Sequence, residues 1–498
     1  MRVAQRLGSQ GKGERMMKRF VSWILLLVAV LWCLPAQAVT AKHYTQLKFP
    51  TLKEVQIPKY ERYVLDNGMV VYLMPDRELP LVGGTALIHT GDRTEPPEKV
   101  GLASLVGSVM RSGGTQSHSA DELNQLLEQR AAAVETGIGE TSGSASFSSL
   151  SEDLEMVFGL FAEVVWQPIF AQDKLDLAKT QIRGGIARRN DNPNGIVGRE
   201  FQKLIYGGNS PYARTVEYAT LDNISRDDLI SFYRQYFHPN NMILGIVGDF
   251  DSQQMRSLIQ KYFGSLPSSR IPQLQLPQVS QANQSKMFLV NLPQLTQSYV
   301  QLGHLGGKFN SPDYPALDVM NQVLNSFGGR LFNSVRSRQG LAYSVYGVWS
   351  PRYDYPGVFA AGGQTRSETT VPFIRAILRQ IEQIKAEPVK PAELAFAKES
   401  VLNSFVFNFE DPSEILSRLM RYEYYDYPAD FLFRYQQSVK ATTTADVQRV
   451  AKQYLKPEQL VTLVVGNATA IQPPLTELAT QVIPVDITIP GSKPLVTK

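Results

Sequence analysis

The chain has 498 residues, of which 43% are hydrophobic and 19% are charged, and its formal net charge at pH 7 is +4. These values are typical of a folded globular protein, and the length predicts two or more domains with a large buried core. The small net charge gives no basic footprint of the kind that binds nucleic acid.

The first 38 residues have the organisation of a secretory signal peptide. The basic stretch KGERMMKR precedes the apolar run FVSWILLLVAVLWCL, and small residues then lead to Ala38. Because the apolar run is shorter than the ~20 residues of a typical membrane-spanning helix, we expect cleavage after Ala38. The chain is therefore predicted to be exported, most simply to the bacterial periplasm, and to contact a membrane only if the leader stays uncleaved.

This leader also carries the positive charge and the only thiol. Its six Lys or Arg residues and single Glu14 give it a net charge of +5, which leaves about −1 for the rest of the chain. Cys33, the only cysteine, lies within the leader. The exported chain is therefore expected to contain no disulfide, no cysteine metal ligand and no cysteine nucleophile.

The sequence contains a long internal duplication. ISRDDLISFYRQYFHPNNMILGIVGD (224–249) and TTTADVQRVAKQYLKPEQLVTLVVGN (442–467) align without a gap, displaced by 218 residues. Each copy predicts an amphipathic helix, a proline-marked turn and an apolar strand that ends at Gly. A displacement of this length indicates two homologous domains rather than a short solenoid repeat.

Local signals place further elements around these copies. YERYVLDNGMVVYLMPD (60–76) predicts a β-hairpin turning at Asn67 and Gly68, and LVGGTALIHTG (81–91) predicts a third strand. Strands separated by helices indicate an α/β layer in each half. The predicted segments are a signal peptide (1–38), an N-terminal domain (48–264), a Pro-, Gln- and Ser-rich linker (265–286), a C-terminal domain (287–470) and a C-terminal tail (471–498).

Several separate stretches occur in the order and approximate spacing of one known family. They are LDNGMVVYLMPD, GLASLVGSVMRSGGT, NDNP, HPNNMILGIVGDFD and GGRLFNSVRSRQGLAYSVY. With them the chain resembles the M16 family of zinc peptidases, which includes insulinase, pitrilysin and mitochondrial processing peptidase, and especially its shorter bacterial members. The resemblance implies an α/β (α+β) fold of two homologous domains, each a mainly antiparallel sheet covered by helices, which form half of a clamshell.

The resemblance also locates the zinc site and implies that it is degenerate. Active relatives carry His-x-x-Glu-His on one helix, where two His bind Zn²⁺ and the Glu activates a water, and a further Glu downstream. The preceding GLA stretch places Ser104 and Ser108 at the His positions and Gly107 at the position of the base. The DNP stretch at 191–193 places Gly185 or a near neighbour at the later Glu. We therefore expect no metal bound by this chain.

Other histidines do not restore a metal site in the sequence. His118 and Glu122 have helical ligand spacing, but Ser119 and Glu122 form a capping-box pattern, which puts His118 outside the helix. His89 and His304 are expected at corresponding strand positions of the two halves. These residues, with His43 and His238, are interpreted as surface or hydrogen-bonded polar residues.

The C-terminal half retains a different part of the family pattern. An apolar helix face that ends at Gly340 is followed by LAYSVYGV, which alternates as a strand. Arg336 then lies in the last helical turn and Tyr343 on the strand, as in an Arg/Tyr pair that holds substrate in active relatives. Such a Tyr can donate to the scissile carbonyl and the Arg to peptide carbonyls. The alternative is structural, with Arg336 capping helix carbonyls and Tyr343 packed in the core.

A Ser- and Gly-rich segment, VETGIGETSGSASFSSLSEDL (134–154), lacks the Gly-Lys-Ser/Thr ending of a phosphate-binding loop. The family has an edge strand near the bound peptide at this place, so Ser144, Ser146 and Ser148 are expected to alternate on its exposed face. A peptide could add to that edge as a further strand. A plain surface strand is the alternative.

These features imply an exported, non-catalytic, substrate-binding subunit of a two-chain M16-type zinc peptidase. The partner would carry His-x-x-Glu-His and the zinc, this chain would supply Arg336 and Tyr343, and the substrate would be a peptide or unfolded protein. The chain is expected to be inactive alone. The alternative is a stand-alone pseudoenzyme that binds peptides or scaffolds an assembly. An independent hydrolase has little support, because no Gly-x-Ser-x-Gly elbow occurs.

Overall fold

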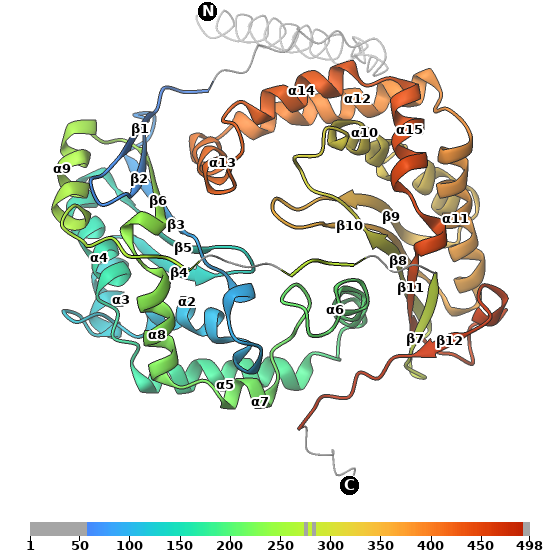
Figure 1. Cartoon of the computed structure of the whole chain (residues 1–498), viewed down its shortest axis with the longest axis horizontal. Coiled ribbons are helices and arrows are strands. Elements are labelled where there is room, and N and C mark those ends of the chain that lie inside the picture. The colour runs from blue at the N-terminus through green and yellow to red at the C-terminus, as the bar shows by residue number, and fades with distance from the viewer. Residues whose placement is uncertain (1–56, 273–276, 281–284, 492–498) are drawn as a thin grey trace, which may run out of the picture. The chain divides into compact units, whose positions relative to one another are not determined.

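A computed structural model describes residues 57–272, 277–280 and 285–491 of the chain. The predicted signal peptide with Cys33, as well as His43 and parts of the predicted linker, lie outside the described residues. Among the described helices, none is both long and apolar enough to cross a lipid bilayer. Each half of the described chain contains one six-stranded sheet (Figure 1).

The sheet of the first half has the strand order β1-β2-β6-β3-β5-β4. Its strands are β1 (Glu61–Val64), β2 (Val70–Pro75), β3 (Leu81–Ile88), β4 (Ala133–Ile138), β5 (Gly143–Leu150) and β6 (Met242–Gly248). The helices of this half are α2 (Leu102–Ser112), α3 (Ala120–Glu128), α4 (Leu154–Trp166), α5 (Gln172–Arg188), α6 (Pro193–Tyr206), α7 (Tyr218–Asp222), α8 (Arg226–Tyr236) and α9 (Ser252–Phe263).

The sheet of the second half has the order β12-β7-β11-β8-β10-β9. Its strands are β7 (Lys286–Asn291), β8 (Gln297–Leu305), β9 (Ala342–Ser350), β10 (Val358–Arg366), β11 (Val461–Gly466) and β12 (Val482–Pro484). The helices are α10 (Tyr314–Asn325), α11 (Thr370–Ala386), α12 (Pro391–Phe405), α13 (Pro412–Tyr424), α14 (Phe431–Ala441) and α15 (Thr444–Tyr454), and η6 (Phe332–Arg338) is a π-helix.

The predicted fold class is confirmed. Both sheets are mainly antiparallel; the parallel pairs are β2 with β6, β7 with β11, and β7 with β12. The two strand orders match position by position, except that β12 occupies the place of β1 at the sheet edge. Residues of the predicted C-terminal tail thus extend the second sheet, in the position that the hairpin strand takes in the first.

The duplication appears in the structure as the same helix, turn and strand in each half. The pair α8 and β6 in the first half corresponds to α15 and β11 in the second, at the predicted displacement. Both helices start with a capping box, in which Ser225 or Thr443 accepts from the backbone of an Asp three residues later. The shared Ser/Thr-x-x-Asp signal therefore fixes both helix starts. The predicted hairpin at Asn67 and Gly68 is also present, joining β1 to β2.

The two halves exchange one helix each. Helix α6 follows α5 in the chain but packs on the second sheet, where Phe201 contacts the apolar cluster that includes Leu463. Helix α13 packs in return on β6 of the first sheet, where Leu416 and Met420 are buried beside Ile243 (Figure 1). Because each apolar helix face is covered only by the other half, the exchange joins the halves through their cores.

Prediction on the helix exchange. Phe201→Ala is expected to destabilise the second half, although residue 201 belongs to the first, because Phe201 is 0% exposed and leaves a cavity against β8 and β11. The free energy of unfolding should fall by about 3–5 kcal/mol. Hydrogen exchange should become faster in β8 and β11.

Phe161→Ala is the matched control, since Phe161 is equally buried but lies in the core of the first half. This variant should loosen the first sheet instead. Loss of protection confined to the first sheet in Phe201→Ala would contradict the exchange.

Candidate functional site

Helix α2 presents the degenerate zinc positions. Its apolar residues, among them Leu105 and Val106, are buried in the first core, while Ser104 and Ser108 are exposed four residues apart on the opposite face. The helix N-terminus is capped from outside, because the Glu95 carboxylate accepts hydrogen bonds from the backbone of Gly101 at 2.9 Å and Ala103 at 2.8 Å. A carboxylate at this end satisfies free N–H groups and favours the helix dipole.

The two serines do not form a metal site. Ser108 Oγ donates to the backbone oxygen of Leu105 at 3.3 Å, and Ser112 Oγ donates to the backbone oxygen of Ser108 at 2.9 Å. A neutral hydroxyl that hydrogen-bonds to its own helix is a poor ligand for Zn²⁺, which prefers imidazole, thiolate and carboxylate. The residues at the two His positions therefore do not fit the metal of active relatives.

Gly107, at the position of the catalytic base, is a packing contact. A Cβ placed here would collide with the backbone nitrogen of Ile138 and lie 2.8 Å from the carbonyl carbon of Gly137, both in β4. Thr136 Oγ1 donates to the Gly107 carbonyl oxygen at 2.6 Å and fixes this approach. Helix and strand thus meet backbone to backbone, and no carboxylate side chain fits without a shift of β4.

Gly185, at the position of the third ligand, has the opposite environment. It lies in α5, a helix that packs on α2, and a Cβ at this position would meet nothing within 4 Å. Space for a ligand is therefore present here, but no ligating side chain. In residues 57–272, 277–280 and 285–491, no three His, Cys, Asp or Glu side chains are grouped so that they could hold a metal ion.

The histidines make other contacts. Ser119 and Glu122 form the predicted capping box, and His118 lies before the helix with Nδ1 2.8 Å from Glu163 Oε2. His304 is buried; its Nδ1 donates to the Leu305 carbonyl, and its Nε2 accepts from the Lys456 backbone at 3.1 Å. Both interpretations as satisfied polar residues are confirmed.

The predicted correspondence of His89 with His304 is wrong by one residue. Leu87 pairs with Ile243 in the first sheet, and Gly303 pairs with Val461, the duplicate of Ile243, in the second. His304 therefore corresponds to Ile88, and His89 lies one residue later. Since successive strand residues point to opposite faces, His304 is buried while His89 is exposed, its ring stacked 4.0 Å from that of Tyr424.

Arg336 and Tyr343 are brought together in the second half. The last turn of η6 carries Arg336, and Gly340, with φ +59°, reverses the chain into β9, which carries Tyr343. The Arg336 guanidinium lies 5.0 Å from the centre of the Tyr343 ring, a cation–π distance. Tyr343 is 81% exposed, so the alternative that it packs in the core is wrong.

Two phenylalanines that the sequence did not single out extend this pair. Arg336 also lies 4.8 Å from the ring of Phe332, which is 4.7 Å from the ring of Phe327. Phe327 is 84% exposed. We call the row of Phe327, Phe332, Arg336 and Tyr343 the aromatic–arginine row. In the sequence, the only indication of this extension is a phenylalanine directly before the Gly328-Gly329 pair. Its exposure, which makes it notable, cannot be read from sequence.

The serine strand is not an edge strand. Ser144, Ser146 and Ser148 alternate with buried residues along β5, as predicted. However, β5 is paired on both sides, with β3 and with β4, so its backbone groups are already hydrogen-bonded and cannot accept a further strand. The edge of this sheet is β4, which comes from the earlier part of the same segment. The prediction that a peptide adds to the serine strand is therefore wrong.

The first half thus carries a helix whose residues, at the positions of two zinc ligands and a catalytic base, do not fit a zinc site. The family described as "Insulinase (Peptidase family M16)" matches residues 84–217, and the one described as "Peptidase M16 inactive domain" matches residues 223–401. The chain belongs to the M16 peptidase family.

Relatives of this chain include both peptidases and non-peptidases by name. "Uncharacterized zinc protease YmxG" of Bacillus subtilis is 24% identical over 72% of this chain and 86% of its own length. "Non-peptidase homolog YmxG" of Helicobacter pylori is 23% identical over 91% of this chain and 99% of its own length.

Among solved structures, a peptidase M16 inactive domain from Pseudomonas fluorescens has a TM-score of 0.75 at 24% identity, covering 84% of this chain and all of that one. This likeness concerns the fold alone. With the inactive-domain match and the replaced ligands, the chain is a non-catalytic member of the family.

Prediction on the glycines of the degenerate site. Gly107→Ala is expected to lower the free energy of unfolding by about 1–3 kcal/mol, because the new methyl group collides with the β4 backbone. Gly185→Ala is the matched control in open space on a helix and should be neutral or stabilising by up to about 1 kcal/mol. Urea denaturation of both variants measures the difference. Equal effects would show that Gly107 is not sterically required.

Prediction on the buried cap. Glu95 is 4% exposed, and burial raises its pKa to about 7 despite the two backbone hydrogen bonds that favour the carboxylate. A raised folded-state pKa contributes stability that is complete below the unfolded value near 4.5 and is lost as pH rises through about 7. The change is on the order of 3 kcal/mol, at 1.36 kcal/mol per pKa unit. Urea denaturation at pH 5 and pH 8 should show a smaller pH dependence in Glu95→Gln than in the native chain.

The control for this experiment is Glu98→Gln, since Glu98 is exposed on the same connection. Its pH dependence should follow the native chain. A Glu95→Gln variant with an unchanged pH dependence would contradict the role given to burial.

Proposed function

We propose that this protein is an exported, substrate-binding subunit of a heterodimeric M16-type zinc metallopeptidase, whose partner carries the His-x-x-Glu-His helix and the zinc. The observation that carries the proposal is the combination of two sites. Ser104, Gly107, Ser108 and Gly185 offer no metal ligand, whereas Arg336 lies stacked on the exposed ring of Tyr343. The exposed ring and the guanidinium beside it are both accessible to a substrate.

The geometry of the pair suits a peptide. Stacking on Arg336 restricts the Tyr343 ring, so its hydroxyl presents one direction for donation to a carbonyl oxygen on which negative charge develops. The planar guanidinium has further N–H donors for peptide carbonyls. Both groups act by binding and orienting the substrate, and the bond cleavage itself is assigned to the partner.

The exposed end of the aromatic–arginine row supports contact with another chain. Phe327 is 84% exposed, and the ring of Phe396, 52% exposed in α12, lies next to Gly328, the residue that follows Phe327. Large apolar side chains gathered on a surface mark interaction sites in soluble proteins. The Arg330–Glu393 ion pair, with N–O distances of 2.9 and 3.0 Å, ties this loop to α12 and keeps the surface in place.

The alternative is a stand-alone peptide-binding or scaffolding pseudoenzyme of the same fold. It predicts a homodimer or a partner that is not a peptidase, and it gives no reason to keep both Arg336 and Tyr343. Export to the periplasm, cleavage of the leader and the absence of bound zinc are parts of the proposal in both forms. The leader supports export by the order of its basic, apolar and small residues.

A pull-down tests the proposal directly. The tagged chain is isolated from its host under mild conditions, and co-purifying proteins are identified and quantified by mass spectrometry. We expect an exported chain of similar size with His-x-x-Glu-His, in near equal amount and with bound zinc. Recovery of the chain alone, or with a protein that is not a peptidase, would favour the alternative.

Prediction on turnover by the pair. Tyr343→Phe removes one hydroxyl and should lower kcat of the reconstituted heterodimer at least about tenfold while assembly is unchanged, because a donor used in the transition state is lost. Tyr218→Phe is the matched control: Tyr218 also lies under an arginine, 5.7 Å from Arg183, but in the first half. It should leave turnover unchanged. Equal kcat values for native chain and Tyr343→Phe would remove Tyr343 from the mechanism.

A further inference from the structure

A polar cavity lies in the second half. None of its lining residues belongs to α2 or α5, which carry the degenerate zinc positions. It has a volume of about 520 Å³ and is bordered by α10, α12, α13, α14 and the turn after β9. This volume is in the range of cavities that hold small molecules or short peptide segments. Its charged lining residues are three arginines, Arg352, Arg418 and Arg421, and one acid, Asp318.

The arginines of this cavity have no carboxylate partners. In the described chain, none of the three guanidiniums lies within 4.0 Å of an Asp or Glu oxygen. Arg418 donates to Asn408 Oδ1 at 2.6 Å, but its Nε is buried without a hydrogen-bond partner. An unpaired buried N–H of a guanidinium is costly, and an anionic ligand would satisfy it.

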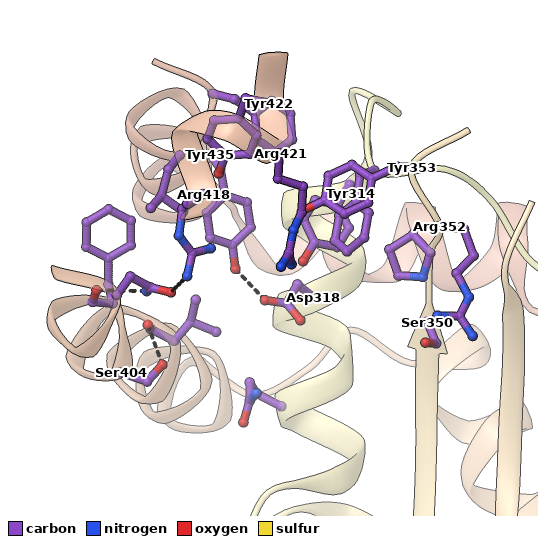
Figure 2. A pocket seen from close by; sticks show the side chains of 18 residues that line it. Tyr314, Asp318, Ser350, Arg352, Tyr353, Ser404, Arg418, Arg421, Tyr422 and Tyr435 are labelled. Carbon is purple, nitrogen blue, oxygen red and sulfur yellow. Dashed lines mark hydrogen bonds between the residues drawn. The ribbon is translucent and has the colours of Figure 1, made fainter. Parts of the chain in front are cut away.

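Two of the guanidiniums come from one helix. Arg418 and Arg421 are three residues apart on α13 and both line the cavity; in Figure 2 Arg421 ends above Asp318, whereas Arg418 lies on the other side of Tyr435 and is turned toward Asn408. Arg352 instead extends along β9, away from them (Figure 2). A guanidinium matches the oxygens of a carboxylate or a phosphate, and two of them line this one cavity.

The single acid does not neutralise this charge. Tyr435 Oη donates to Asp318 (Figure 2), and Asn321 Nδ2, which the figure does not draw, donates to its other oxygen at 3.4 Å. Burial raises the pKa of the Asp318 carboxyl. Both carboxyl oxygens of Asp318 accept hydrogen bonds from neutral side chains and not from the arginines. With three arginines and one acid in its lining, the cavity carries a net positive charge.

The cavity is part of a longer run of hollows. A second cavity of about 290 Å³ shares Arg352, Tyr353 and Arg421 with it. A third of about 790 Å³ shares Thr141, Asp354, Tyr424 and Tyr425 with the second. Tyrosine rings and hydroxyls recur along the run, and such side chains bind peptide segments through both apolar and polar contacts. An elongated, polar and aromatic surface suits an extended chain better than a compact small molecule.

We propose that this run of cavities binds an extended peptide and that Arg418 and Arg421 bind an acidic side chain of that peptide. This inference rests on the proposed function in taking the ligand to be a peptide. It adds a preference for acidic segments, at a site distinct from the aromatic–arginine row. Phosphate has the same charge chemistry and is the competing source of the anion.

The test is isothermal titration calorimetry of the full chain with two amidated decapeptides that differ only in two central residues, glutamate in one and glutamine in the other. The native chain should bind the glutamate peptide about tenfold more tightly or better. Arg421→Gln should abolish that difference and leave the glutamine peptide unaffected. Arg421 is the residue to change first because it is exposed, whereas Arg418 also holds Asn408.

Arg379→Gln is the matched control. It removes the same charge from an exposed position on α11 outside the cavities, and it should bind both peptides as the native chain does. Equal affinity of the native chain for both peptides, no measurable binding of either, or an unchanged preference in Arg421→Gln would overturn the inference. Tighter binding of inorganic phosphate than of the glutamate peptide would assign the site to phosphate and overturn it as well.

These outcomes separate the inference from the proposed function. If acidic peptides bind through Arg421 but no zinc peptidase co-purifies and Tyr343→Phe has no effect, the two-chain enzyme fails while the acidic-peptide site stands. If the pair assembles and depends on Tyr343 but ignores glutamate, the site fails while the enzyme stands.

Discussion

The close approach of α2 to β4 is the constraint that decides which side chains the degenerate zinc helix can carry. At Gly107 the two backbones meet, and Thr136 holds them together with a hydrogen bond to the Gly107 carbonyl. A side chain at this position would have to displace the main chain of β4, so the helix cannot carry a catalytic base there. The helix retains its apolar face and its external cap from Glu95, and both contribute to the stability of the core. The helix therefore lacks a catalytic base for a steric reason as well, in addition to the replacement of the metal ligands.

The second half holds Arg336 and Tyr343 side by side through local backbone geometry. The π-helical turn of η6 and the left-handed Gly340 direct the chain so that Arg336 and Tyr343 stack although seven residues separate them. An α-helical continuation would rotate the arginine by a different angle per residue. Stacking on Arg336 holds the exposed Tyr343 ring in one orientation and leaves its hydroxyl accessible to a ligand.

Helix α13 contacts both halves of the chain and also carries two arginines of the polar cavity. One face of the helix buries Leu416 and Met420 against the first sheet, and another points Arg418 and Arg421 into the cavity of the second half. The position of the guanidiniums therefore depends on the docking of α13 on a sheet that precedes it by more than a hundred residues in the chain. Any change in the relation of the halves would also change the cavity.

The sequence by itself determined the duplication, the sheet class, the capping boxes and the positions where zinc ligands are replaced, because these follow from local periodicity, short turn signals and residue chemistry at fixed spacing. The tertiary structure decided which strand forms an edge, which placed the serine strand inside the sheet, and the register that separates His89 from His304. It also decided the helix exchange, the exposure of Phe327 and Tyr343, and the placement of Arg418, Arg421 and Asp318 around one cavity. These features depend on contacts between residues far apart in the chain, and no local pattern specifies which distant surface covers a given apolar face.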